Sequence, residues 1–164
     1  MPPNREHPVT ATDRAVDLVT NAAQAAADKL AHNIIAFDVS DVLAITDAFV
    51  LASAPNDRQV KAIADAVEEQ LREHCDTKPV RREGEREGRW ILLDFLDIVV
   101  HVQHSEERSY YGLERLWKDC PEIDLPEDAK ATRNLGSEDE FVRQPNEFDH
   151  VEAVLAAEAD RSMR

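Results

Sequence analysis

Two short apolar runs in the first third of the chain constrain its fold more than any other feature. The runs "IIAFDV" at 34–39 and "DAFVLASA" at 47–54 are almost continuously apolar. A strand with one face in water alternates between apolar and polar residues, whereas a strand covered on both faces does not. The two runs therefore predict β-strands that carry packed layers on both faces.

Two helices are predicted beside these strands. Residues 13–31 have apolar positions at helical spacing, and the Thr12 hydroxyl is placed to cap their start. Pro55 ends the second strand, and Asn56 or Asp57 can cap the helix that follows. The apolar residues of that helix form one stripe: Val60, Ile63, Ala64, Val67 and Leu71.

Three more strands and a short helix complete the predicted domain. The strands are expected at 78–84, 90–95 and 97–103, and a tight hairpin near Phe95–Leu96 joins the last two. A final helix is expected over 106–118. The order α-β-β-α-β-β-β-α predicts an α/β fold, with a mixed five-stranded sheet and helices packed on it.

The character of the chain changes at about residue 120. Residues 1–120 are expected to form the folded domain, whereas residues 121–164 hold 12 acidic and 5 basic residues without sustained periodicity. Such composition predicts a flexible acidic extension. Near its end, residues 150–163 predict a short helix from the spacing of Val151, Val154 and Leu155.

Charge and composition narrow the classes of partner. The net charge of −15 argues against docking on phosphates, which depends on Lys and Arg, and favours a basic partner. No apolar run approaches the roughly 20 residues that cross a bilayer. The first residues lack the apolar core of a signal peptide, so we expect a cytoplasmic protein. Cys75 and Cys120 have no paired motif, which indicates two reduced thiols.

No group of residues in the sequence predicts catalysis, a metal site or a cofactor. Residues three apart on a strand face opposite sides, so His101 and His104 cannot share a metal there. Asp94 and Asp97 flank the hairpin, where carboxylates can cap a turn, bind a partner or hold Mg²⁺. We favour the turn-capping role. The serines and glycines match neither a nucleophile elbow nor a phosphate-binding loop.

The stretch "SEERSYYGLERLW" at 105–117 concentrates the large aromatic residues. On a single helix, Tyr110, Leu113 and Trp117 share one stripe, which is expected to pack on the sheet. A second stripe, expected to face outward, holds Glu107, Tyr111, Glu114 and Lys118. Tyrosine and tryptophan often anchor interfaces, so this helix is a candidate docking surface. The alternative, that the aromatic residues serve only the core, stays open.

Taken together, these segments resemble the ribosomal silencing factor family, RsfS or Iojap. The resemblance runs from about Val16 to Trp117. Its landmarks are "FDV", "ITDAFVLAS", Arg58, "IADAVEE", "EG" at 83–84, "WILLD", "DIVVHV" and the pattern E-x-R-x-Y-Y-x-L-E-x-L-W. Each landmark alone is weak, but their order and spacing are specific.

The resemblance implies a fold with nucleotidyltransferase-like topology, homodimers and no enzymatic activity. It also implies binding to the fourteenth protein of the large ribosomal subunit. From the acidic charge and the lack of a long apolar run, we expect no membrane contact and little direct contact with nucleic acid. Bound to that ribosomal protein, a family member sterically blocks joining of the small subunit and represses translation under nutrient limitation. The alternatives are a large-subunit assembly factor without repression and a nucleotidyltransferase-like enzyme.

The resemblance also assigns candidate partner-binding residues by match. They are Trp90, Asp94, Asp97, His101, Arg108, Tyr111, Glu114 and Trp117, and Asp47 and Glu83 also match. We expect Trp90, Tyr111, Glu114 and Trp117 to be the main anchors or their supports. Asp94, Asp97 and Arg108 would then align the polar contacts with the partner. Which of these residues contact the partner and which hold the fold stays open.

Two turns depart from the family pattern. The chain has "SAPND" where the family has a glycine-containing turn, which moves it further from nucleotidyltransferase chemistry. The hairpin reads "DFLD" where the family has D-x-G-D. Leu96 tolerates a positive φ poorly, so we expect this turn to adopt another geometry.

Overall fold

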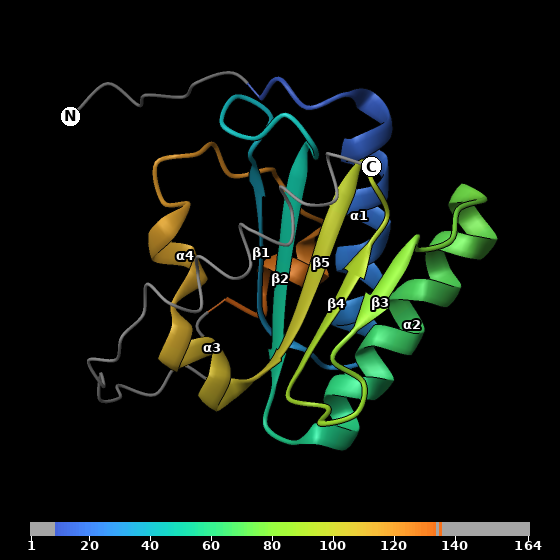
Figure 1. The fold of residues 1–164 in the computed structure, drawn as a ribbon, viewed down its shortest axis with the longest axis vertical. Helices are drawn as coiled ribbons and strands as arrows, with labels where there is room; N and C mark the ends of the chain where they lie inside the picture. Colours follow the sequence, from blue (N-terminus) through green and yellow to red (C-terminus); the bar gives the residue numbers. More distant parts are fainter. Residues whose placement is uncertain (1–8, 134, 136–164) are drawn as a thin grey trace.

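A single mixed sheet forms the centre of the molecule, for which the computed structural model describes residues 9–133 and 135 (Figure 1). Its spatial order is β1-β2-β5-β4-β3. Strands β2 and β5 are parallel, and the other neighbouring pairs are antiparallel. The five strands are β1 (His32–Asp38), β2 (Ala48–Ala54), β3 (Arg81–Glu83), β4 (Trp90–Asp94) and β5 (Ile98–His104). The predicted mixed five-stranded sheet is therefore confirmed.

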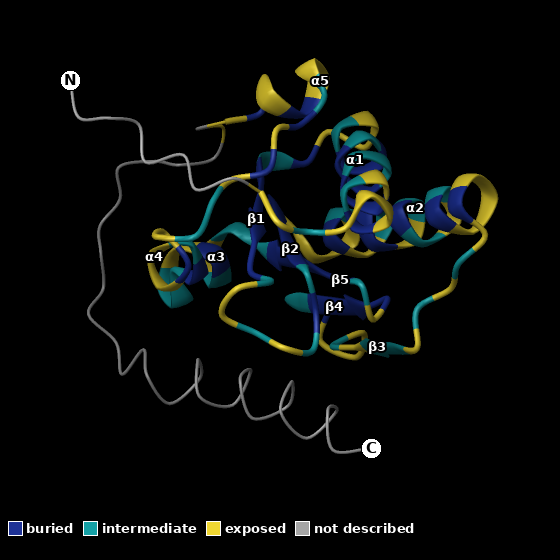
Figure 2. Cartoon of the chain, turned by 90° about the horizontal axis from the view of Figure 1, so that it is seen from above, coloured by how far each residue is buried: buried dark blue, intermediate teal, exposed yellow. Residues whose placement is uncertain are grey.

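Helices lie on both faces of this sheet (Figures 1 and 2). The first face is covered by α1 (Asp13–Asp28) and α2 (Asp57–Cys75), which pack side by side. On the second face lie two shorter helices, α3 (Ser105–Tyr111) and α4 (Leu113–Leu116). All seven residues of β2 are buried, as the apolar run at 47–54 predicted.

Local signals at the starts of α1 and α2 match the structure. The Thr12 hydroxyl accepts a hydrogen bond from the Ala15 N–H at 3.1 Å, and the Asn56 side chain accepts one from Gln59 at 2.9 Å. Both bonds satisfy backbone donors that a helix cannot pair internally. The stripe from Val60 to Leu71 is fully buried against the first face.

The edge strand β3 is shorter than predicted. It covers Arg81–Glu83 instead of 78–84. Proline at position 79 has no N–H to donate to a ladder, and Gly84 leaves the strand at a φ of 91°. A Cβ at Gly84 would lie 1.8 Å from the Trp90 carbonyl oxygen, so only glycine fits at this close approach.

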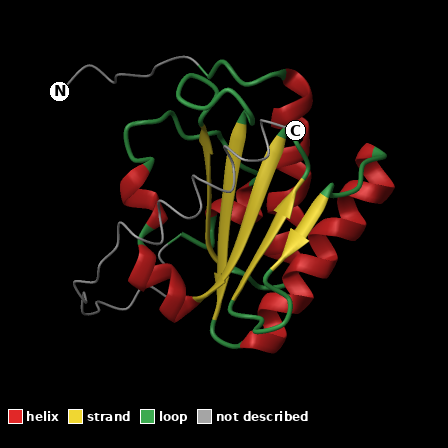
Figure 3. Cartoon of the chain, in the orientation of Figure 1, coloured by secondary structure: helices red, strands yellow, loops and turns green. Residues whose placement is uncertain are grey.

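The predicted helix over 106–118 is wrong as a single helix (Figure 3). Gly112 adopts a left-handed conformation, with φ 52° and ψ 47°, and ends α3. Its N–H donates to the Arg108 carbonyl, and α4 restarts the chain at a new angle. Glycine reaches this conformation at no steric cost, so the chain turns there although the residues on both sides favour a helix.

Residues 121–133 also differ from the prediction of a flexible extension. The Ile123 N–H donates to the Ala36 carbonyl at 2.9 Å, so this segment pairs with the edge of β1. It continues into α5 (Glu127–Lys130), which packs near α1. Ile123, Leu125 and Ala129 are buried in the same core as α1 and α2. The expectation is wrong for these residues because their apolar side chains cover a strand edge without following a helical or strand period. The helix predicted at 150–163 lies outside the described residues.

Candidate functional site

A continuous chain of aromatic rings crosses the second face of the sheet. Its inner part is buried: Trp117 lies edge-on to Phe49, with ring centroids 5.1 Å apart, and Phe49 lies edge-on to His101 at 5.3 Å. Phe49 comes from β2 and His101 from β5, which pair in parallel. Trp117 follows α4 and packs onto these strands, as predicted for the inward stripe.

The outer part of the aromatic chain reaches the surface. Trp90 on β4 lies 5.9 Å from the His101 ring and 5.3 Å from the Tyr111 ring, and Tyr111 stacks on Tyr110 at 4.7 Å. Trp90, Tyr110 and Tyr111 are each half-buried. Tyr110 was expected on the inward stripe, but the break at Gly112 places it beside Tyr111 instead. We call these three residues the aromatic surface.

A hydrogen bond fixes the junction between the two parts. The Trp90 indole N–H donates to Nδ1 of His101 at 3.1 Å. Nδ1 must therefore be an acceptor, and the neutral imidazole carries its hydrogen on Nε2. We predicted that His101 is half-buried and bonded to a neighbour; the bond is present, and the residue is fully buried. The buried His101 therefore holds the Trp90 indole in place.

Two carboxylates of α3, the helix that carries Tyr110 and Tyr111, lie near the aromatic surface. Arg89 holds both of them, Glu106 at 2.7 Å and Glu107 at 3.0 Å. Burial, followed by the charge of Glu107 and the neighbouring Tyr110, raises the pKa of the Tyr111 phenol. The phenol therefore keeps its proton at neutral pH and can donate a hydrogen bond to a partner.

Arg108 holds α3 and α4 against the sheet. Its guanidinium donates to Glu114 at 2.8 Å, to the Asn33 carbonyl at 2.7 Å and to the Ser53 hydroxyl at 3.4 Å. The Arg108 side chain is 6% exposed, whereas that of Glu114 is 30% exposed. Of this matched pair, Glu114 is therefore the more accessible to solvent, and Arg108 holds its carboxylate.

Gln103 is a buried polar residue that the sequence did not single out. It lies on β5 between Ser53 of β2 and Trp90 of β4 in the register of the sheet. Its side chain is fully buried, and within residues 9–133 and 135 neither its amide nitrogen nor its oxygen has a hydrogen-bond partner. Phe49 was also missed, because only the β2–β5 pairing brings it beside His101.

Asp94 and Asp97 lie at the opposite end of the sheet from Trp90. Asp94 accepts a hydrogen bond from the Leu96 N–H at 2.8 Å, which confirms the turn-capping role. Leu96 itself adopts a φ of 73°, so our expectation of another turn geometry is wrong. Asp97 accepts a hydrogen bond from Arg14 at 3.3 Å and links the hairpin to α1. The structure does not bring these two carboxylates to the aromatic surface.

The two further matched residues also lie away from the aromatic surface or at its margin. Asp47 accepts a hydrogen bond from the Thr12 N–H at 3.0 Å, close to the start of α1. Glu83 is exposed on the edge strand β3 and pairs with Leu92. Asp47 therefore has a structural contact, and Glu83 lies on the β3 side of the second face.

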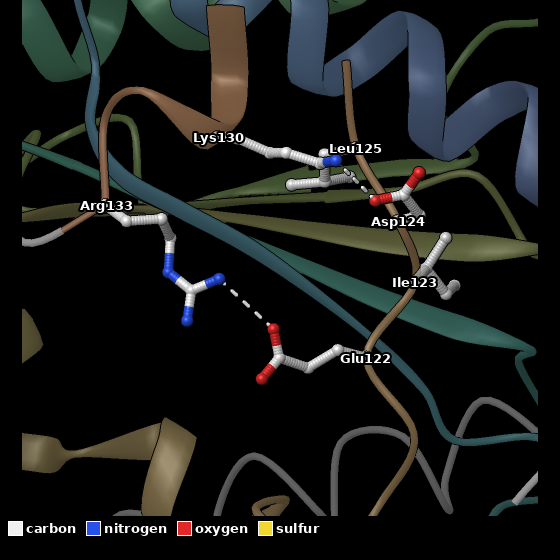
Figure 4. A pocket seen from close by; sticks show the side chains of 6 residues that line it. All are labelled: Glu122, Ile123, Asp124, Leu125, Lys130 and Arg133. Carbon is white, nitrogen blue, oxygen red and sulfur yellow. Dashed lines mark hydrogen bonds and ion pairs between the residues drawn. The ribbon is translucent and has the colours of Figure 1, made fainter. Parts of the chain in front are cut away.

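Three other features were candidates for a site: metal-ligating side chains, the two cysteines and a surface cavity. No group of three or more metal-ligating side chains is found among the described residues. Cys75 and Cys120 are free, and burial raises the pKa of both thiols, which disfavours the reactive thiolate. A cavity of about 230 Å³ lies at the C-terminal segment (Figure 4). Ion pairs border it, Lys130 with Asp124 at 2.8 Å and Arg133 with Glu122 at 3.1 Å.

No described helix is long and apolar enough to cross a membrane. The fold and the second face together define an α/β domain with one mixed sheet and an aromatic surface that has carboxylates nearby. A family model described as "Ribosomal silencing factor during starvation" matches residues 12–149. The chain belongs to this family, the ribosomal silencing factors or RsfS, as the resemblance implied.

Curated relatives agree with this assignment. The ribosomal silencing factor RsfS of Bacillus subtilis is 43% identical over 104 residues, which cover 63% of this chain and 87% of the relative. That of Halalkalibacterium halodurans is 37% identical over 109 residues, 66% of this chain and 92% of the relative. The chloroplastic Iojap protein of Zea mays is 30% identical over 121 residues, 70% of this chain and 50% of the relative.

Solved structures share the fold. Protein CV0518 from Chromobacterium violaceum superposes with a TM-score of 0.60 at 34% identity, over 62% of this chain and 84% of that one. A protein from Bacillus halodurans superposes with a TM-score of 0.58 at 35% identity, over 66% of this chain and 98% of that one. The α/β architecture is therefore common to this chain and these proteins.

Proposed function

We propose that this protein represses translation by binding the large ribosomal subunit and sterically blocking the small subunit from joining. Membership of the ribosomal silencing factor family supports the ribosome as target. The proposed contact is the fourteenth protein of the large subunit, and the proposed setting is the cytoplasm under nutrient limitation. The observation that carries the proposal is the aromatic chain, which is anchored in the core at Trp117 and ends at the surface at Tyr111.

The aromatic surface has the properties of an interface anchor. Trp90 and Tyr111 bury large areas at low entropic cost, and Tyr111 adds a polar hydroxyl group. The charge of Glu107 acts on Tyr111, Glu114 lies on the following helix α4, and both carboxylates suit a basic partner. The net charge of −15 raises the rate of encounter with such a partner. Little direct contact with nucleic acid is expected from such a surface.

The other matched residues are assigned supporting roles in this proposal. His101 orients Trp90, Arg108 positions Glu114, and Trp117 anchors the aromatic chain in the core. Asp94 and Asp97 shape the hairpin at the far end of the sheet. The protein acts by occupancy and without catalysis, and it forms homodimers when free.

The Tyr111→Ala variant tests the docking surface. We expect it to weaken binding to the fourteenth large-subunit protein by about 2 kcal/mol, because a half-buried aromatic anchor is lost. Affinity is measured by calorimetry, and melting checks that the fold is intact. Val42→Ala, which trims an exposed apolar residue at the other end of the sheet, is the matched control. Unchanged affinity in a folded Tyr111→Ala protein would remove the residue from the interface.

A subunit-joining assay with purified subunits tests the repressor role. The protein should reduce the yield of joined ribosomes, and Tyr111→Ala should reduce it less. Binding to the large subunit without any effect on joining would identify an assembly factor instead.

Thermal melting with ATP or CTP and Mg²⁺ tests for an enzyme. The nucleotidyltransferase-like topology that the resemblance implies remains a prediction. A saturable rise of the melting temperature with nucleotide would contradict a purely steric role, because a ligand of the folded state stabilises it.

A further inference from the structure

We propose that Arg89 is a positioning residue for the aromatic surface. It holds the first turn of α3 and thereby sets the place of Tyr111 at the end of that helix, without contacting the partner itself. The effect on partner binding rests on the proposed function. The contact between Arg89 and the helix stands on its own observations and can be tested in the free protein.

The helix α3 has no apolar anchor in the core. Among its seven residues only Arg108 is buried, whereas α2 buries six residues, among them Val60, Ile63 and Leu71. A helix as short as α3 is not stable alone in water, so contacts outside it decide where it lies. Polar contacts must therefore set the orientation of α3 and of the Tyr111 ring that it carries.

Arg89 makes such contacts at the start of the helix. Its Nη2 lies 2.7 Å from Glu106 Oε1 and 3.0 Å from Glu107 Oε1, and its Nε donates to Glu107 Oε1 at 3.1 Å. The planar guanidinium can hold both carboxylates at once, because its N–H groups point outward in a fixed fork. We call this set of contacts the Arg89 clamp.

The backbone of Arg89 is fixed at the point where α3 begins. Its carbonyl accepts a hydrogen bond from the His104 N–H at 2.8 Å. His104 is the N-cap of α3, and its Nδ1 accepts a hydrogen bond from the Glu106 N–H at 3.0 Å. The end of the sheet therefore holds Arg89 beside the first turn of the helix, so the clamp forms with little further loss of conformational freedom.

Arg89 and the next residue, Trp90, contact opposite ends of α3. The Trp90 ring lies 5.3 Å from the ring of Tyr111, the last residue of the helix. Arg89 contacts Glu106 and Glu107 in the first turn. Two successive residues thus fix two points of the helix, and two points define the direction of its axis. Without the clamp, the first turn is freer to move, and the Tyr111 ring moves with it.

A third carboxylate connects the clamp to the first face of the sheet. Nη1 of Arg89 lies 3.8 Å from Asp57 Oδ1 in the first turn of α2. Gly88 permits this approach, since it has a φ of 67° and a Cβ placed on it would lie 3.4 Å from the Asp57 Cβ. The buried stripe of α2 holds that helix on the core, so Asp57 gives the clamp a fixed reference.

The exposure of the clamp bounds its effect. The Arg89 side chain is 37% exposed, and those of Glu106 and Glu107 are 75% and 25% exposed. An exposed ion pair changes an equilibrium by at most about fivefold, and salt weakens it. We therefore expect the clamp to raise the population of the correctly placed helix, whereas the fold as a whole does not depend on it.

Hydrogen exchange in the free, full-length protein tests the clamp. In the parent, backbone amides from Ser109 to Gly112 should exchange about threefold faster at about 0.5 M salt than at about 0.05 M, because salt screens the clamp. Arg89→Ala should already exchange faster at low salt and should respond little to added salt. Arg86→Ala removes the same charge from an exposed position in the turn before β4 and should behave like the parent.

Three results would overturn the clamp. They are α3 amides that do not respond to salt in the parent, equal exchange in the parent and Arg89→Ala, and a loss of protection in Arg89→Ala that extends to α2. The last would show a general loss of stability instead of a local displacement of α3. The response of the parent to salt needs no variant, so it remains informative if Arg89→Ala does not fold.

Binding to the large subunit tests the link to the proposed function. Arg89→Ala should bind about fivefold more weakly than Arg86→Ala. Both variants carry the same net charge, so long-range attraction to a basic partner is matched between them. Equal binding of the two variants would show that Arg89 does not position the docking surface. If the parent itself fails to bind, the proposed function is wrong, and the exchange experiment alone decides whether the clamp holds α3.

Discussion

The two faces of the sheet differ in the side chains that they bury. At its centre the first face presents apolar side chains, such as Ile34, Val50 and Val102, to two long helices, and its charged residues, such as Arg82, lie at its margins. The second face mixes aromatic rings with buried polar groups, among them Gln103 and Arg108, under two short helices. An apolar layer tolerates rearrangement while volume is kept, whereas buried polar groups must each meet a partner in one geometry. The first face is therefore suited to stability and the second to holding a surface in a defined shape.

The largest effect should come from the first face. Ile63→Ala removes a fully buried side chain of α2 and should lower the free energy of unfolding by about 4 kcal/mol. Chemical denaturation measures the loss, and Lys61→Ala on the exposed side of the same helix is the control. While the variant remains folded, its affinity for the large subunit should be unchanged. A parallel loss of affinity would show that the two faces are not separate in function.

Arg108→Ala should have the next largest effect, and it should act on both stability and binding. It leaves Glu114 and the Asn33 carbonyl without their donor, which should cost about 3 kcal/mol of unfolding free energy. Affinity should also fall, because α3 and α4 lose the contact that positions Tyr111 and Glu114. Lys118→Ala, an exposed charge after α4, is the control. A stability loss below about 1 kcal/mol would contradict the assigned role of Arg108.

The contrast between the faces also explains what the sequence could predict. The stripe of α2 and its cap at Asn56 follow from local spacing and were predicted correctly. The turn at Gly112 was missed because the residues around it favour a helix and only one glycine marks the break. Phe49 and Gln103 were missed because their importance depends on which strands become neighbours. Local patterns therefore specify the first face well and the second face poorly.

Residues 121–133 illustrate the same limit at the edge of the sheet. Ile123, Leu125 and Ala129 are spaced irregularly, yet all three are buried. Their burial depends on the edge of β1, which no local pattern reveals. The family landmarks supplied the candidate site residues, and the structure shows that Tyr111 is half-buried whereas His101 and Arg108 are buried.

Asp38 at the end of β1 provides a smaller, pH-dependent test on the side of α1. Burial alone would raise the pKa of Asp38, but hydrogen bonds from Ser40, Ala11 and Thr10 outweigh it and lower the pKa below 3.8. A lowered carboxyl pKa stabilises the fold above the unfolded pKa, near 3.9, and this contribution is lost as pH falls through the folded pKa.

Asp38→Asn should therefore cost about 1.5 kcal/mol at neutral pH, where the charged hydrogen bonds are complete. The difference between the variant and the parent should shrink as pH falls below about 4. Denaturation at a series of pH values measures it, with Asp41→Asn, an exposed neighbour, as the control. A difference that stays constant with pH would show that the charge of Asp38 does not stabilise the fold.

The smallest change in the free energy of unfolding should come from replacing a buried polar residue of the second face by an apolar one, and the reverse on the first face. Gln103→Met replaces a buried amide, which lacks hydrogen-bond partners among the described residues, with an apolar side chain of similar length. It should raise the free energy of unfolding by about 1 kcal/mol, because the cost of the unpaired amide disappears. The reverse exchange, Val102→Thr at the preceding residue of β5, puts a hydroxyl into the first face. It should lower the free energy of unfolding by a similar amount. If both changes destabilise, Gln103 has a polar partner in the folded protein, and the second face is as completely satisfied as the first. If they act in opposite directions, the second face retains a buried polar group that lowers the stability of the fold, whereas the apolar centre of the first face contains none.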